Sequence, residues 1–105
     1  MSNRSEKIAE ALRETAAEFL ASEAGRESMI TVTNTAVSED GRRGIIFITV
    51  LPEAHEEAAL AFANRNRGEL DGAFRQHVKG VRLPHIEYRI DKGEKNRQRL
   101  DELSN

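Results

Sequence analysis

The chain has 105 residues, enough for one domain that buries about two thirds of its unfolded surface. Charged residues make up 32% and aromatic residues 5%, so the core must be mainly aliphatic. The absence of cysteine excludes disulfides, thiolate metal sites and a cysteine nucleophile. No apolar run approaches the roughly 20 residues of a membrane span, and the first residues lack the apolar stretch of a signal peptide, so we expect a cytoplasmic protein.

The first half of the sequence predicts one helix followed by a β-hairpin. Five apolar side chains recur at helical spacing near the start: Ile8, Leu12, Ala16, Phe19 and Leu20. Gly25 is expected to end this helix. Residues 29–37 are rich in β-branched side chains, and residues 44–51 are apolar at nearly every position, which predicts a central, covered strand. The polar turn at 38–41 predicts that the two strands pair as a hairpin.

The second half predicts two helices and a third strand. Pro52 is expected to start a helix, because proline is tolerated in the first turn, and residues 59–63 supply its apolar face. A polar break at residues 66–68 opens a second helical pattern, whose apolar members are Leu70, Phe74, Val78 and Val81. Pro84 closes that pattern. A strictly alternating strand follows, with Ile86, Tyr88 and Ile90 on one side.

Together these elements predict an α+β domain with the order α-β-β-α-α-β, built as a three-stranded sheet with helices packed on one face. We expect the domain to span residues 1–91 and residues 92–105 to form a charged, flexible tail. The sequence leaves the place of the third strand open. The expected core contains Ile8, Leu12, Phe19, Ile30, Val32, Ile46, Ile48, Val50, Phe74, Val78, Ile86, Tyr88 and Ile90.

The formal net charge of −2 hides an asymmetry along the chain. Residues 64–99 hold ten basic and five acidic side chains, a balance of +5. Residues 1–63 hold six basic and eleven acidic side chains, a balance of −5. Such a chain can offer a basic face to phosphate groups while its acidic end stays solvated. On charge alone, ordinary mixing of charges on helix surfaces explains the composition equally well.

The order of elements resembles that of type II KH domains, which bind RNA. The Gly-x-x-Gly loop of KH domains is missing, but one branch of the fold, the bacterial ribosome-binding factor A family, lacks that loop. This branch has an Ala-x-Gly kink between its last two helices, and Asn66-Arg67-Gly68 falls at that kink. The spacing from Gly68 to Pro84 and on to Asp91 is similar to the family pattern, as are residues 31–40 and 99–103.

The sequence departs from the family pattern at several positions. Asn66 replaces the alanine of the kink, which is a mild change because asparagine tolerates helix-breaking geometry. Asp71 stands where the family usually has an arginine, which removes one possible phosphate contact. Residues 25–28 replace an Asp-Pro-Arg turn before the first strand. These differences indicate a divergent member.

The resemblance implies a non-enzymatic, monomeric assembly factor that binds the small ribosomal subunit and assists maturation of the 5′ end of its ribosomal RNA. Its work would be phosphate contact and shape recognition. The residues expected to contact RNA are Arg65, Asn66, Arg67, Gly68, Arg75, Lys79 and Arg82. We expect Arg75, Lys79 and Arg82 to share one helical face, since they are spaced i, i+4 and i+7. We expect Gly68 to need a backbone conformation that a Cβ makes costly.

Two other classes of function compete with this one. An enzyme is disfavoured because His55, His77 and His85 lack metal-ligand spacing and no nucleophile or phosphate-loop motif occurs, so we expect no cofactor, metal or small-molecule substrate. A protein-interaction module that uses its sheet or its acidic helix remains an alternative. The two non-enzymatic hypotheses differ in salt dependence, because phosphate neutralisation makes affinity fall steeply with salt.

Overall fold

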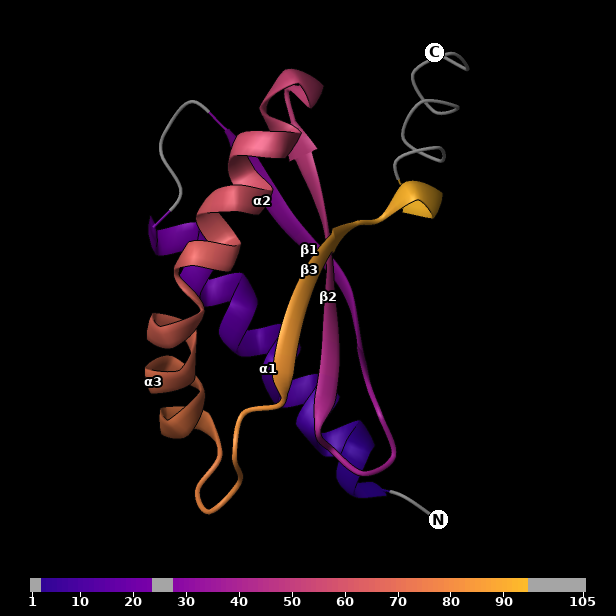
Figure 1. The fold of residues 1–105 in the computed structure, drawn as a ribbon, viewed down its shortest axis with the longest axis vertical. Helices are drawn as coiled ribbons and strands as arrows, with labels where there is room; N and C mark the ends of the chain where they lie inside the picture. The colour runs from indigo at the N-terminus through magenta and orange to yellow at the C-terminus, as the bar shows by residue number, and fades with distance from the viewer. Residues whose placement is uncertain (1–2, 24–27, 95–105) are drawn as a thin grey trace.

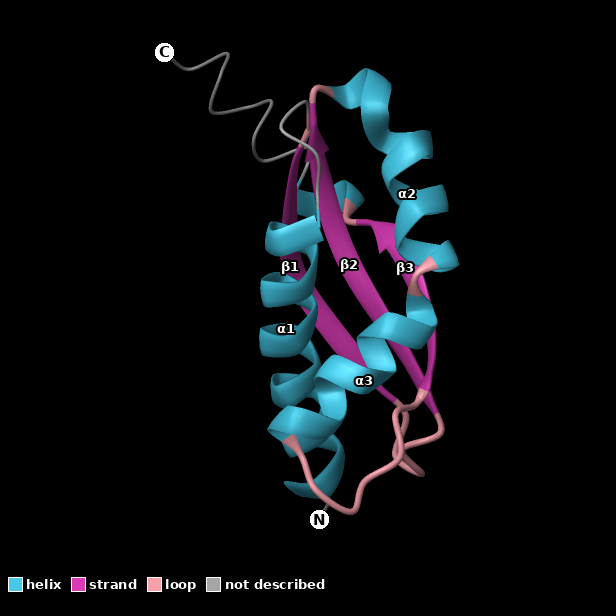
Figure 2. Ribbon diagram, turned by 90° about the vertical axis from the view of Figure 1, so that its left-hand side faces the viewer, coloured by secondary structure: helices cyan, strands magenta, loops and turns pink. Residues whose placement is uncertain are grey.

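The computed structural model describes residues 3–23 and 28–94 of the chain. Figure 1 shows one sheet, and Figure 2 shows the helices layered on one of its faces. The predicted α+β class, the element order and the one-sided packing are confirmed. The expected helix end at Gly25 and most of the predicted tail lie outside the described residues. The elements are α1 (Asn3–Glu23), β1 (Met29–Val37), β2 (Arg43–Leu51), the short 3-10 turn η1 (Glu53–His55), α2 (Glu56–Arg65), α3 (Arg67–His77) and β3 (His85–Ile90).

The sheet has the strand order β1-β2-β3, so β2 is central as predicted. β1 and β2 form the predicted antiparallel hairpin. β3 lies parallel to β2, with His85 opposite Arg43 and Ile90 opposite Ile48. A parallel neighbour needs a long crossover connection, and α2 with α3 supplies it.

Helices cover one face of β2, so the covering that its apolar sequence predicts applies to that face alone. Ile46 and Ile48 point toward the helices and have no exposed surface. Ile45 and Phe47 alternate with them on the other face and are partly exposed. An apolar run therefore does not distinguish a strand covered on two faces from one covered on a single face.

The core lies between the sheet and the three helices. Nine of the predicted core residues are buried, and the other four pack against them partly exposed: Ile30, Val32, Val78 and Ile90. The predicted set omitted several alanines and leucines that are also buried: Ala16, Leu20, Ala59, Ala63 and Leu70. The alanines allow the helices to approach their neighbours closely, a role that hydrophobicity alone does not indicate.

The helix α3 ends earlier than the apolar pattern predicts. It stops at His77, and Val78 has an extended backbone with φ −135° and ψ 120°. Gly80 follows with φ +75°, a left-handed conformation that stops a helix and that glycine adopts without cost. Val78 and Val81 still pack against the core, now from a loop. The spacing of Val78 and Val81 is compatible with a helix and with this loop, so it does not locate the end of α3.

Tyr88 brings a hydroxyl group into the core. The residue is 3% exposed, and its hydroxyl has no hydrogen-bond partner among the described residues. Burial raises the pKa of Tyr88 from 10.0 to about 12, and the charge of Arg67 opposes this change. We expect Tyr88→Phe to increase the free energy of unfolding by about 1 kcal/mol, because a buried unpaired hydroxyl costs about 1–3 kcal/mol.

The raised pKa of Tyr88 also predicts sensitivity to alkali. The folded state holds the phenol proton more tightly than the unfolded state does, so the associated stability is complete below about pH 10 and is lost as the pH rises through about 12. Tyr88→Phe should abolish this loss. Urea unfolding of both proteins at about pH 7 and about pH 11 measures the effect. An equal alkaline loss in both proteins would contradict the assignment to Tyr88.

Candidate nucleic-acid interface

Asn66 makes the break between α2 and α3. Its backbone leaves the helical range, with φ −102° and ψ 23°, and its side-chain Nδ2 donates to the carbonyl oxygen of Phe62 at 2.8 Å. Its own carbonyl oxygen accepts the N–H groups of Glu69 and Leu70, each at 3.2 Å. One residue therefore ends α2 and begins α3, and the predicted break is confirmed.

Gly68 lies inside the first turn of α3 and has an ordinary conformation. Positive φ values occur among the described glycines only at Gly41 and Gly80. A Cβ added to Gly68 would meet no atom within 4 Å. The prediction that Gly68 needs a costly backbone state is therefore wrong, because Asn66 makes the break. The space around Gly68 therefore accommodates a Cβ without a clash from outside the helix.

Arg67 is held by contacts within the protein. Its Nη1 donates to the carbonyl oxygen of Ile86 at 3.0 Å, and its Nε donates to the carbonyl oxygen of Asn64 at 3.1 Å. Ile86 belongs to β3, which is an edge strand. Arg67 therefore satisfies a backbone carbonyl of the sheet edge and connects the helix junction to the sheet. Arg65, at the end of α2, is exposed and forms no ion pair with a described residue.

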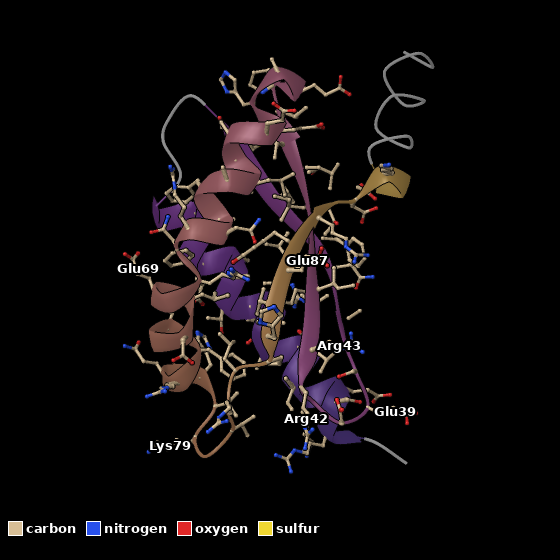
Figure 3. The ribbon with its side chains drawn as sticks, in the orientation of Figure 1. Glu39, Arg42, Arg43, Glu69, Lys79 and Glu87 are labelled. Atoms are coloured by element: carbon tan, nitrogen blue, oxygen red, sulfur yellow. The ribbon has the colours of Figure 1, made fainter. Side chains whose placement is uncertain are left out.

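Arg75, Lys79 and Arg82 do not share a helical face. Arg75 lies in the last turn of α3, whereas Lys79 and Arg82 lie in the segment of residues 78–84, which we call the 78–84 loop. The early end of α3 overturns the predicted i, i+4, i+7 arrangement. Figure 3 shows Lys79 at the end of the molecule, beyond the last turn of α3.

Asp71 pairs with one of the predicted RNA contacts. Its Oδ2 lies 3.2 Å from Nη2 of Arg75, one helical turn away. The arginine side chain is 73% exposed, so the pair contributes at most about 0.5 kcal/mol to stability. The pair matters more for RNA binding than for stability. Asp71 stands where the family pattern has a cation, and its charge offsets that of Arg75. We expect Arg75 to be a weaker phosphate contact than Arg65, Lys79 or Arg82.

Arginines that the sequence did not select lie near the 78–84 loop. Arg42 and Arg43 belong to the β1–β2 turn region, and Arg4 lies in the first turn of α1. The N-terminal end of α1, this turn and the 78–84 loop lie at the same end of the molecule (Figures 1 and 3). The parallel pairing of β3 with β2 brings the segments together. The charge balance along the chain does not indicate these arginines, because they belong to residues 1–63, which have a balance of −5.

The described residues do not favour another kind of site. The three histidines lie on different elements: His55 Nδ1 contacts Oγ of Ser28 at 2.7 Å, and His77 contacts Glu18 at 3.1 Å. Residues 3–23 and 28–94 contain no group of three or more histidine or acidic side chains that could hold a metal ion. In the same residues, no helix has both the length and the apolar character needed to cross a bilayer.

Two curated relatives are similar to almost the whole chain. The ribosome-binding factor A of Geobacter sulfurreducens is 31% identical over 109 residues, which cover 98% of this chain and 90% of the relative. That of Desulforamulus reducens is 24% identical over 106 residues, which cover 98% of this chain and 88% of the relative. The family model described as ribosome-binding factor A matches residues 4–104.

Two known structures have a similar fold. The crystal structure of ribosome-binding factor A from Thermus thermophilus superposes with a TM-score of 0.70 at 24% identity, covering 82% of this chain and 94% of that one. A homology model of the Thermus thermophilus factor, fitted into a cryo-EM map of a 30S complex, gives 0.69 at 23% identity and covers 89% and 97%. With a family match that spans nearly its whole length, the chain belongs to the ribosome-binding factor A family.

Proposed function

We propose that this protein binds the small ribosomal subunit through its ribosomal RNA and assists maturation of the RNA's 5′ end without catalysing a reaction. The observation that carries the proposal is membership of the ribosome-binding factor A family, in which a Thermus thermophilus relative has been fitted into a 30S complex. We further propose that it acts as a cytoplasmic monomer without a cofactor, and that residues 1–91 form the RNA-binding domain.

The exposed cations of the second half support phosphate contact. Arg65, Lys79 and Arg82 are exposed, and none of them forms an ion pair within the described part of the chain. Helix α3, with 11 residues, separates Arg65 from the 78–84 loop by about 16 Å. Cations at both ends of α3 suit contact with several phosphates along one RNA backbone, a contact that positions the RNA without reading its sequence.

The helix junction suits a close approach of RNA. Nothing lies within 4 Å of the position that a Cβ would take on Gly68, so an RNA backbone can come near the first turn of α3. Asn66 and Arg67 fix the angle between the two helices through their own hydrogen bonds. We propose that these two residues mainly hold the junction in shape and that Arg65 supplies its free charge.

Co-sedimentation with small ribosomal subunits in sucrose gradients tests the proposal. We expect binding at low salt and a linear fall of log affinity with log salt, with a slope near −0.7 for each phosphate contacted in single-stranded RNA. A protein-interaction module would bind with little dependence on salt. No co-sedimentation at low salt would contradict the proposed function, and salt-independent binding would favour the alternative.

A further inference from the structure

A cleft of about 670 Å³ opens at the end of the molecule where three distant segments meet. Its walls are the first turns of α1, the β1–β2 turn and the 78–84 loop, which lie together in Figures 1 and 2. Ile8 and Pro84, which are buried, contribute apolar surface to it. Three arginines, one from each wall, line this end cleft: Arg4, Arg42 and Arg82.

Hydrogen bonds and packing hold the walls of the end cleft in place. The carbonyl oxygen of Arg42 accepts the N–H of His85 at 2.8 Å, which fixes the β1–β2 turn beside the start of β3. Gly41, with φ +73°, lies beside α1, where an added Cβ would be in ordinary van der Waals contact with Cδ1 of Ile8 at 3.5 Å. Arg4 is one helical turn before Ile8 and therefore lies on the same face of α1. The backbone segments that carry Arg4 and Arg42 are therefore held in place by contacts with the rest of the domain.

The charge lining the end cleft is unbalanced. None of its three arginines forms an ion pair with a described residue. Asp40 is the one acidic residue among those that line it. Its Oδ1 accepts the Ser38 hydroxyl at 2.6 Å and the Arg42 N–H at 3.0 Å, and these bonds hold the pKa of Asp40 below its usual value. Even with Asp40 ionised, three guanidinium groups against one carboxylate leave a local excess of two positive charges.

We propose that the end cleft binds a phosphate group of an RNA backbone, with the guanidinium groups of Arg4, Arg42 and Arg82 as its ligands. Planar guanidinium groups donate two parallel hydrogen bonds to phosphate oxygens, and this geometry favours arginine at such sites. The inference rests on the proposed binding of ribosomal RNA and extends the proposed contact at the 78–84 loop to arginines of two other segments. Arg4 and Arg42 belong to this cleft and to none of the contacts considered above.

The double variant Arg4→Gln with Arg42→Gln tests the cleft directly. In NMR titrations of the full chain with a short single-stranded oligoribonucleotide, the amide signals of Gly41, Arg82 and His85, which line the cleft, should shift in the parent protein. We expect these shifts to be lost in the double variant. A parallel titration with inorganic phosphate shows whether the cleft binds free phosphate or the phosphate groups of RNA. Shifts with inorganic phosphate but not with RNA would overturn the assignment of RNA.

A control of equal charge change carries Arg13→Gln and Arg89→Gln, which are exposed arginines outside the cleft that pair with Glu10 and Glu87. The control should keep the shifts, and a loss of shifts equal to that of the cleft variant would overturn the proposal. In subunit co-sedimentation, the cleft variant should lower the steepness of the salt dependence by about 0.7, the contribution of one phosphate contact in single-stranded RNA.

The two proposals can fail separately. If the oligoribonucleotide shifts the cleft amides but the parent protein does not co-sediment with small subunits, the cleft is supported and the ribosomal function is contradicted. If the parent binds subunits and the cleft variant binds them with unchanged affinity and salt dependence, the cleft is contradicted and the ribosomal function stands. A circular dichroism melt of each variant confirms that the exposed substitutions leave the fold intact.

Discussion

Phe74→Ala should lower the free energy of unfolding by about 3–5 kcal/mol. Phe74 lies in α3, has no exposed surface and belongs to the single core cluster that joins the helices to the sheet. Replacing its ring with a methyl group removes buried apolar area and leaves a cavity that the close-packed surroundings fill only in part. Because small domains are stable by only about 5–15 kcal/mol, this loss threatens the folded state.

Thermal unfolding followed by circular dichroism measures this effect. At about 4–8 °C for each kcal/mol in a domain of this size, the midpoint should fall by more than about 12 °C. Gln76→Ala, an exposed position on the same helix, is the matched control and should change stability by less than about 0.5 kcal/mol. A Phe74→Ala midpoint within a degree or two of the parent would show that α3 is not packed on the sheet as described.

The sequence predicted most of the fold because its strongest signals are local. The β-hairpin follows from two β-branched segments and a short turn, and the predicted range of the first strand, residues 29–37, agrees with β1. The burial of Leu12 and Phe19 follows from helical spacing in the same way. Such signals involve residues that are close in the chain, so no knowledge of distant neighbours is needed to interpret them.

The sequence failed where several distant segments decide the outcome. The parallel place of β3 depends on how the α2–α3 crossover packs, which the alternation of Ile86 and Tyr88 does not encode. The helix α3 ends before the extended backbone of Val78, and the turn at Gly80 follows, although Val78 and Val81 continue the helical spacing. These two features limit the prediction of the candidate site most. The early end of α3 separates Arg75 from the loop cations, and the place of β3, which the sequence leaves open, brings the segments of the end cleft together.

Reversing the two cations of the 78–84 loop, with Lys79→Glu and Arg82→Glu, should weaken binding to small ribosomal subunits by about 100-fold or more at low salt. Both side chains are exposed, and neither forms an ion pair within the described part of the chain. Hydrogen bonds to charged groups are worth about 1.5–3 kcal/mol each, so losing two phosphate contacts already accounts for this change. The introduced carboxylates then repel the RNA backbone, and the salt dependence should become less steep by about 1.4, which is about 0.7 for each of the two phosphate contacts.

Co-sedimentation over a range of salt concentrations measures both quantities, and two further variants define the cause. Arg75→Glu should have a smaller effect than either loop substitution, because Asp71 already offsets the charge of Arg75 at 3.2 Å. Arg13→Glu with Arg89→Glu imposes the same change in net charge on exposed side chains elsewhere and should leave most of the binding intact. If this control weakens binding as much as the loop variant, net charge alone explains the loss. If the loop variant binds like the parent, Lys79 and Arg82 lie outside the interface, and the RNA must contact the protein through the helix junction or another surface.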